Sequence, residues 1–134
     1  SYSLQIFDLS HTHISFLPES IGNLLSLQTL NLSSMQIREF PKNINAILGL
    51  SVLVLENSIL SRLPEELLSL NLEFRNVTYE RLYSKPGIYI RGLRLLKQPV
   101  SLFYQPRELI IEYYRQPQIE INETKVIFLG SEGV

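Results

Sequence analysis

A 23-residue period is the feature that most constrains the fold of this chain. Leu4, Leu27 and Leu50 recur at that interval. Apolar residues recur in the same way at the fourth, sixth and eleventh positions of each unit: Phe7, Leu30 and Leu53; Leu9, Leu32 and Leu55; Ile14, Ile37 and Leu60. One such unit cannot bury its apolar face alone, so neighbouring units must stack and share a continuous core.

Each unit also carries an apolar residue followed by proline in its second half: Leu17-Pro18, Phe40-Pro41 and Leu63-Pro64. This pattern resembles the leucine-rich-repeat family over roughly residues 4–103. The resemblance implies an α/β fold: a solenoid with a parallel concave sheet and short helices or turns on its convex side. Within each unit, alternation predicts a strand such as Phe7-Asp8-Leu9, with Asp8 pointing outward. Proline steers the return segment toward a turn or a short helix.

The outward positions of successive strands are the best candidates for binding a protein partner. Parallel stacking makes them one contiguous concave surface. They are Ile6, Asp8 and Ser10 in the first unit, Thr29, Asn31 and Ser33 in the second, and Val52, Val54 and Glu56 in the third.

The period predicts one domain of leucine-rich repeats over residues 1–103, with units starting at 4, 27, 50 and 85. Residues 71–84 are interpreted as an insertion. Its strand, Leu72 to Val77, is expected to return as a hairpin through Lys85-Pro86-Gly87 and pair with Ile88–Ile90, closing the sheet edge. The family usually has asparagine at the ninth position; here Thr12 and Ser58 partly substitute for it, and Met35 is expected to weaken the ladder.

Residues 104–123 are predicted to form a helix and a connector. The helix, Arg107–Arg115, places Leu109, Ile110, Tyr113 and Tyr114 on one face. Residues 124–134 then read as the first strand of a nucleotide-binding domain, Lys125–Leu129, followed by a glycine turn. In the phosphate-binding loop G-x-x-x-x-G-K-[ST], backbone N–H groups cradle the phosphates. The first five of its eight positions are matched by Gly130, Ser131, Glu132, Gly133 and Val134.

The stretch from Leu63-Pro64 to Gly130 resembles the join between the repeats and the Ras-like Roc domain of bacterial-type Roco proteins. The residues that carry this resemblance are Gly87-Ile88-Tyr89-Ile90, Gln105, Ile110, Tyr113-Tyr114 and Lys125–Gly130. The resemblance implies that the parent protein is a GTPase using GTP and magnesium, with residues 130–134 lining the phosphates. This chain alone, which stops before the lysine and the magnesium ligand, is expected to have no GTPase activity and no cofactor. The helix at 107–115 is expected to contact the attached GTPase domain.

Composition narrows the classes of partner. Lys and Arg total 12 against 13 acidic residues, and the net charge of −1 argues against nucleic acid. No apolar run is long enough for a membrane helix, and the absence of cysteine fits a cytoplasmic location. His11 and His13 lack a third metal ligand, and Glu65-Glu66 are better placed at the start of a helical turn than as an acid and base pair.

Two functions remain open at this stage. One is a regulatory repeat array attached to a Roco-type GTPase, and the other is a plain leucine-rich-repeat interaction scaffold with no nucleotide domain. Three sequons beginning at Asn31, Asn76 and Asn122 would matter in a secreted protein. Extracellular relatives of the repeat family usually carry cysteine-rich caps, however, and this sequence has no cysteine.

Overall fold

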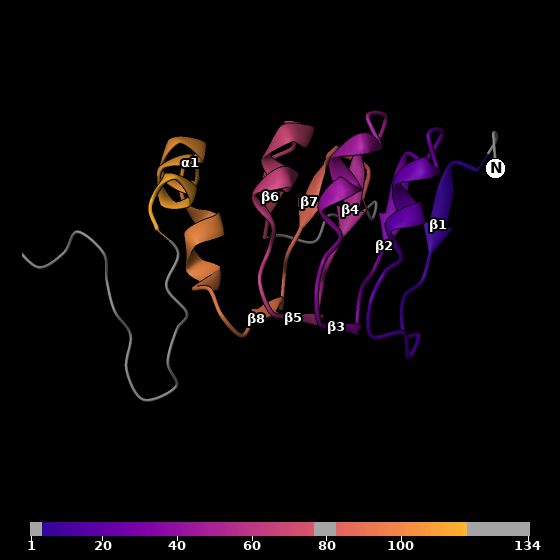
Figure 1. Ribbon diagram of the computed structural model, residues 1–134, viewed down its shortest axis with the longest axis horizontal. Coiled ribbons are helices and arrows are strands. Elements are labelled where there is room, and N and C mark those ends of the chain that lie inside the picture. Colours follow the sequence, from indigo (N-terminus) through magenta and orange to yellow (C-terminus); the bar gives the residue numbers. More distant parts are fainter. Residues whose placement is uncertain (1–3, 77–82, 118–134) are drawn as a thin grey trace, which may run out of the picture.

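The computed structural model describes residues 4–76 and 83–117, which form two parallel sheets linked by short helices (Figure 1). The larger sheet has five strands in the order β1 (Ile6–Asp8), β2 (Thr29–Asn31), β4 (Val52–Val54), β7 (Gly87–Tyr89) and β6 (Phe74–Arg75). The smaller sheet has three strands in the order β3 (Gln36–Ile37), β5 (Ile59–Leu60) and β8 (Arg94–Leu95). Parallel sheets with short helices give an α/β repeat arrangement, as the sequence period predicts.

Strand pairing follows the sequence period residue by residue. Phe7 pairs with Leu30, and Leu30 pairs with Leu53. Leu53 then pairs with Ile88, so the register resumes after the insertion where counting from residue 85 predicts. The predicted alternation is also confirmed, because Phe7 packs against the core while Asp8 is exposed.

Proline sets the point at which each return segment becomes helical. The four 3-10 helices are η1 (Glu19–Asn23), η2 (Lys42–Ala46), η3 (Glu65–Leu70) and η4 (Val100–Tyr104), and each begins directly after a proline: Pro18, Pro41, Pro64 and Pro99. Proline fixes φ at about −65° and has no N–H, so it cannot continue a sheet ladder but suits the entry to a helical turn. Glu65 and Glu66 occupy the first turn of η3, as predicted.

The sheets and helices enclose one apolar core. Leu30, Leu53 and Ile88 are fully buried along the larger sheet, while Ile44 and Leu67 are buried on the helices that face it. Each such side chain contributes about 1.5–3 kcal/mol by leaving water. Equivalent residues of successive units touch, so this stabilisation is shared between neighbours.

A residue with left-handed backbone follows four of the five strands of the larger sheet. The φ angles are 61° at His11, 57° at Ser34, 60° at Asn57 and 75° at Gly92. The turn from the sheet into the return segment therefore repeats as faithfully as the strands do. At Gly92 a Cβ atom would also collide with the side-chain oxygen of Asn57, so this turn accepts only glycine without rearrangement.

The ninth position of each unit is filled differently in each turn of the chain. Ser58 is fully buried; its hydroxyl donates to the Leu32 carbonyl at 2.6 Å and accepts from the Met35 N–H at 2.9 Å. Thr12 instead donates to Leu9 at 2.8 Å, within its own unit. The buried Met35 supplies no such donor, but Ser58 of the next unit satisfies its N–H. The expected break at Met35 is therefore bridged from the neighbouring unit.

The prediction of a hairpin in the insertion is wrong. β6 pairs with β7 in parallel, with Phe74 beside Ile88 and Arg75 beside Tyr89. β6 is shorter than the expected strand from Leu72, and it forms the outer edge of the sheet with β7 between it and β4. β6 thus lies one position beyond the strand next to β4, and the later strand β7 occupies the position between them.

Tyr83, which precedes β7, packs against Val52 and Val54 of β4, on the face of the five-stranded sheet opposite the 3-10 helices. We call this face of the five-stranded sheet the outer face.

The helix α1 (Arg107–Arg115) packs at the end of the structure opposite β1 (Figure 1). Its bounds are as predicted, but only part of its apolar face is covered. Ile110 is buried and Tyr114 packs against the core, whereas the side chain of Leu109 is 52% exposed. The predicted strand Lys125–Leu129 and loop 130–134 lie outside the described residues.

Candidate functional site: the outer face of the five-stranded sheet

On the outer face of β1 and β2 the same polar arrangement occurs twice. Oδ1 of Asp8 accepts hydrogen bonds from the N–H of Ser10 at 2.9 Å and from its hydroxyl at 2.6 Å. Oδ1 of Asn31 accepts the equivalent bonds from Ser33 at 3.0 and 2.9 Å. Such short-range bonds favour the bend that follows each strand. They also hold both polar side chains in fixed positions at the surface.

Asp8 gives this part of the face its negative charge. The hydrogen bonds from the hydroxyl and the N–H of Ser10 lower the pKa of the Asp8 carboxyl below its ordinary value, with a smaller contribution from His11. Bonds donated to a carboxylate stabilise its charged form. Asp8 is therefore anionic at neutral pH and remains exposed to a partner.

At β4 the outer face is covered by tyrosine side chains. Val52 and Val54 are 7% and 0% exposed, and they pack with Tyr89, which is 1% exposed, and with Tyr83. The rings of Tyr83 and Tyr89 meet edge to face, with centroids 4.9 Å apart. The two valines point outward as predicted, but in this conformation the tyrosine side chains cover them and a partner cannot contact them. Their cover comes from the insertion and the strand that follows it.

Polar contacts hold this tyrosine pair in place. The Tyr83 hydroxyl donates to Oε1 of Glu56 at 2.7 Å, and the Tyr89 hydroxyl donates to the Lys85 carbonyl at 2.6 Å. Burial, followed by the hydrogen bond and the charge of Glu56, raises the pKa of Tyr83 well above its ordinary value. Oε2 of Glu56 is buried without a hydrogen-bond partner. One carboxylate oxygen on the outer face thus lacks a donor.

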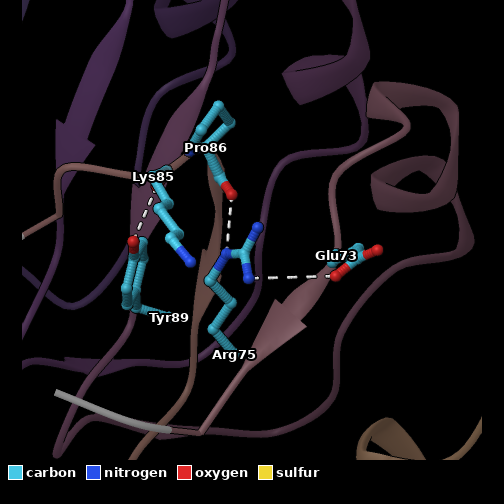
Figure 2. A network of polar contacts seen from close by, with 5 residues as sticks. All are labelled: Glu73, Arg75, Lys85, Pro86 and Tyr89. Carbon is cyan, nitrogen blue, oxygen red and sulfur yellow. Dashed lines mark hydrogen bonds and ion pairs between the residues drawn. The ribbon is translucent and has the colours of Figure 1, made fainter. Parts of the chain in front are cut away.

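Beyond the tyrosine pair, Arg75 fixes the end of the insertion (Figure 2). Its Nε donates to the Pro86 carbonyl at 2.7 Å, and Nη1 lies 3.8 Å from a carboxylate oxygen of Glu73. A Cβ atom on Gly87 would lie 2.5 Å from Arg75 Nε. Glycine at this position therefore lets the arginine side chain lie across the strand.

The structure brings most of the predicted binding positions onto one face but leaves them unequally accessible. Ile6 is 65% exposed and Asp8 is exposed. The half-buried members are Ser10, Thr29, Asn31, Ser33 and Glu56. Sequence reasoning missed Tyr83, Tyr89 and Arg75. Tyr89 stands at the outward position next to Val54 in the strand register, so counting from residue 85 could have placed it, whereas nothing in the period locates Tyr83.

Other candidate sites receive no support from the described residues. His11 lies at a left-handed turn and His13 is exposed. Within residues 4–76 and 83–117 no three His, Cys, Asp or Glu side chains lie close enough together to hold a metal ion. Over the same residues no helix is long and apolar enough to cross a membrane.

At the C-terminal end, a small polar network joins α1 to the repeats. Gln98, which is 2% exposed, accepts from the Leu63 N–H at 2.8 Å and donates to the Tyr114 hydroxyl at 3.1 Å. Tyr114 in turn donates to the Leu63 carbonyl at 2.5 Å. Burial raises the pKa of Tyr114 above its ordinary value. Tyr114 thus serves to seat the helix on the repeats.

Comparison of the sequence with known protein families identifies the first repeat unit. The family model described as Leucine Rich Repeat matches residues 3–24. No curated protein matches the sequence. The matched segment contains β1 and η1, whose equivalents recur along the chain in the same parallel register. Residues 3–24 are therefore a leucine-rich repeat, and the remaining strands extend an α/β arrangement of that kind.

Proposed function

We propose that this chain is a protein-interaction module, a short leucine-rich-repeat solenoid whose partner binds the outer, concave face of the five-stranded sheet. The observation that carries the proposal is the fixed row of outward side chains on β1 and β2. Asp8 and Asn31 are held by paired bonds from Ser10 and Ser33. Groups that are fixed before binding lose little conformational freedom when a partner arrives.

Site-specific photo-crosslinking tests where the partner binds. A benzoylphenylalanine placed at Thr29, on the outer face, is expected to form a crosslink with a protein from the native cell. The matched control places the same group at Lys42 on η2. The crosslink at Thr29 should disappear when Asn31→Arg introduces bulk and charge beside it. Crosslinks from Lys42 alone, or a Thr29 product that is unaffected by Asn31→Arg, would contradict this location.

We further propose that the module is the regulatory repeat region of a larger cytoplasmic GTPase of the Roco type. The support is the apolar run Lys125–Leu129 followed by the glycines of residues 130–134, and the order in the chain, with repeats before the loop. In this proposal residues 130–134 bind the phosphates of GTP together with magnesium in the parent protein. The chain itself lacks GTPase activity.

The contact between α1 and the GTPase domain is proposed to use the exposed side of the helix. Ile110 and Tyr114 are engaged with the repeats, which leaves Leu109 as the exposed apolar residue. Replacing Leu109 by Lys in the full-length protein should change the rate of nucleotide exchange. An unchanged rate would remove α1 from the contact.

A plain interaction scaffold with no nucleotide domain is the second candidate function. The two are separated by the gene sequence after Val134, which should continue with Gly-Lys-Ser or Gly-Lys-Thr. The extended protein should also bind GTP saturably, and Gly133→Val should abolish that binding. Any other continuation of the sequence would leave the plain interaction scaffold as the remaining candidate function.

A further inference from the structure

The side chains that surround Tyr83 contact both its ring and its hydroxyl. Val52 and Val54 make its apolar floor, and the edge of Tyr89 lies against the inserted ring at 4.9 Å. Glu56 supplies a carboxylate oxygen at 2.7 Å from the phenol hydroxyl. We call Val52, Val54, Glu56 and Tyr89 the tyrosine socket. An apolar wall with one fixed acceptor is the usual construction of a site for an amphipathic ring.

Three members of the socket, Val52, Val54 and Tyr89, are held in place by contacts other than those with the Tyr83 ring. Val52 and Val54 belong to β4, which is paired on both sides, and the Tyr89 hydroxyl has its own acceptor in the Lys85 carbonyl. Glu56 retains a second oxygen, Oε2, buried and without a partner. The socket thus has a preformed shape and one acceptor more than Tyr83 uses.

Tyr83 is a less firmly held occupant than these walls. It belongs to the connection before β7, outside any strand or helix, and its side chain is packed on the socket while the residue as a whole is only half-buried. Its φ of 60° lies in the left-handed region, which is strained for a bulky side chain. A half-buried residue outside regular secondary structure opens more readily than a central strand.

We propose that the tyrosine socket binds a tyrosine side chain of a protein partner, and that Tyr83 occupies the socket in the unbound chain until that side chain displaces it. This inference rests on the proposed partner-binding function of the same face. It makes Tyr83 an intramolecular competitor for the partner.

The charges around the socket define the ligand further. Glu56 and Asp8 both act against negative charge on the phenol oxygen of Tyr83. A phosphorylated tyrosine would bring about two negative charges to these carboxylates. The socket is therefore specific for the unmodified phenol.

The test uses p-cresol, which has the shape of a tyrosine side chain, and the variant Tyr83→Ala of the whole chain. Methyl resonances of Val52 and Val54 should shift as p-cresol binds at concentrations on the order of millimolar. Toluene lacks the hydroxyl donor and should bind Tyr83→Ala about tenfold more weakly than p-cresol does. The double variant Tyr83→Ala/Glu56→Gln should bind p-cresol about tenfold more weakly than Tyr83→Ala does. The control Tyr104→Ala removes a tyrosine that is 49% exposed on η4. Because Tyr83 still competes in this control, its two valines should shift only at higher p-cresol concentrations than in Tyr83→Ala.

The proposal would be overturned if the methyl resonances of Val52 and Val54 in a folded Tyr83→Ala variant did not shift with p-cresol. It would also be overturned if this variant bound toluene with the same affinity as p-cresol. In either case Tyr83 would only be a structural cover for the two valines. The wild-type chain labelled with 3-fluorotyrosine gives a second measurement that does not depend on the variant folding. Excess p-cresol should move the fluorine resonance of Tyr83 toward its solvent-exposed position, and an unmoved resonance would also overturn the proposal.

These outcomes can be distinguished from a failure of the proposed partner-binding function. Phenol binding is measured on the purified chain, so it can fail while crosslinks at Thr29 persist. Conversely, loss of the Thr29 crosslinks would remove the partner-binding face without changing the binding of p-cresol. If both proposals hold, Tyr83→Ala should increase partner crosslinking at Thr29 and p-cresol should reduce it.

Discussion

Ser58→Ala tests whether one hydroxyl joins two neighbouring units of the chain. The Ser58 hydroxyl is the donor to the Leu32 carbonyl and the acceptor for the Met35 N–H, and the residue is fully buried. Alanine leaves both backbone groups buried without that partner. Each such loss costs about 1–3 kcal/mol. Because the carbonyl retains a second lone pair and the site relaxes, we expect a total of about 2–4 kcal/mol.

Urea unfolding followed by far-ultraviolet circular dichroism measures this loss. The midpoint should fall while the slope stays constant, which would mean that stability has changed without a change in the surface exposed on unfolding. Ser61→Ala is the matched control, because this half-buried serine lies in the same unit on the other side of β5, and it should change stability by no more than about 0.5 kcal/mol. Equal effects of the two substitutions would refute the reasoning that Ser58 replaces the missing ninth-position asparagine.

Three further predictions follow from other contacts. Tyr114→Phe removes the bonds to Leu63 and Gln98 and should lower stability by about 1–2 kcal/mol, whereas Tyr104→Phe, at an exposed tyrosine, should be near neutral; equal losses in thermal unfolding would contradict the seating role of Tyr114. Gly87→Ala should cost about 1 kcal/mol by displacing Arg75 from the Pro86 carbonyl. A double-mutant cycle should show a smaller added cost in an Arg75→Ala background, where the new Cβ atom still lies 3.0 Å from the Glu73 carbonyl oxygen; full additivity would exclude this explanation. The raised pKa values of Tyr83 and Tyr114 mean that folding favours their neutral forms. The contribution of these two tyrosines to the free energy of unfolding is therefore complete below about pH 10, the pKa of tyrosine in the unfolded chain. It is lost as the pH rises above that value. Absorbance titration at about 295 nm should show two tyrosines ionising late, and the double variant Tyr83→Phe/Tyr114→Phe should remove both delayed steps.

The repeating parts of this fold could be predicted from the sequence because they depend on local spacing. The period locates the strands, the prolines locate the 3-10 helices, and counting from residue 85 gives the pairing of Leu53 with Ile88. These features are set within one unit and copied by stacking. They need no knowledge of the rest of the chain.

The parts that could not be predicted depend on the path of the insertion. Two short apolar strands pair equally well in either direction, and nothing in the residues around Phe74 distinguishes parallel from antiparallel pairing with Ile88. Tyr83 lies on the outer face, where it covers Val54. The strand positions predicted to point outward do so on all three strands, but their accessibility at β4 depends on a residue outside the period.

The interchanged order of β6 and β7 has a consequence for how the chain folds during synthesis. In a simple repeat array each new unit docks on the one made before it, so folding can advance with the ribosome. Here β6 emerges first, but its only neighbour in the sheet is β7, which emerges later and must pair with β4 on its other side. A nascent chain that ends at residue 76 thus has a strand without a neighbour. β6 can pair with β7 only after residue 89 has been made, so this edge of the sheet assembles out of the order in which its strands are synthesised.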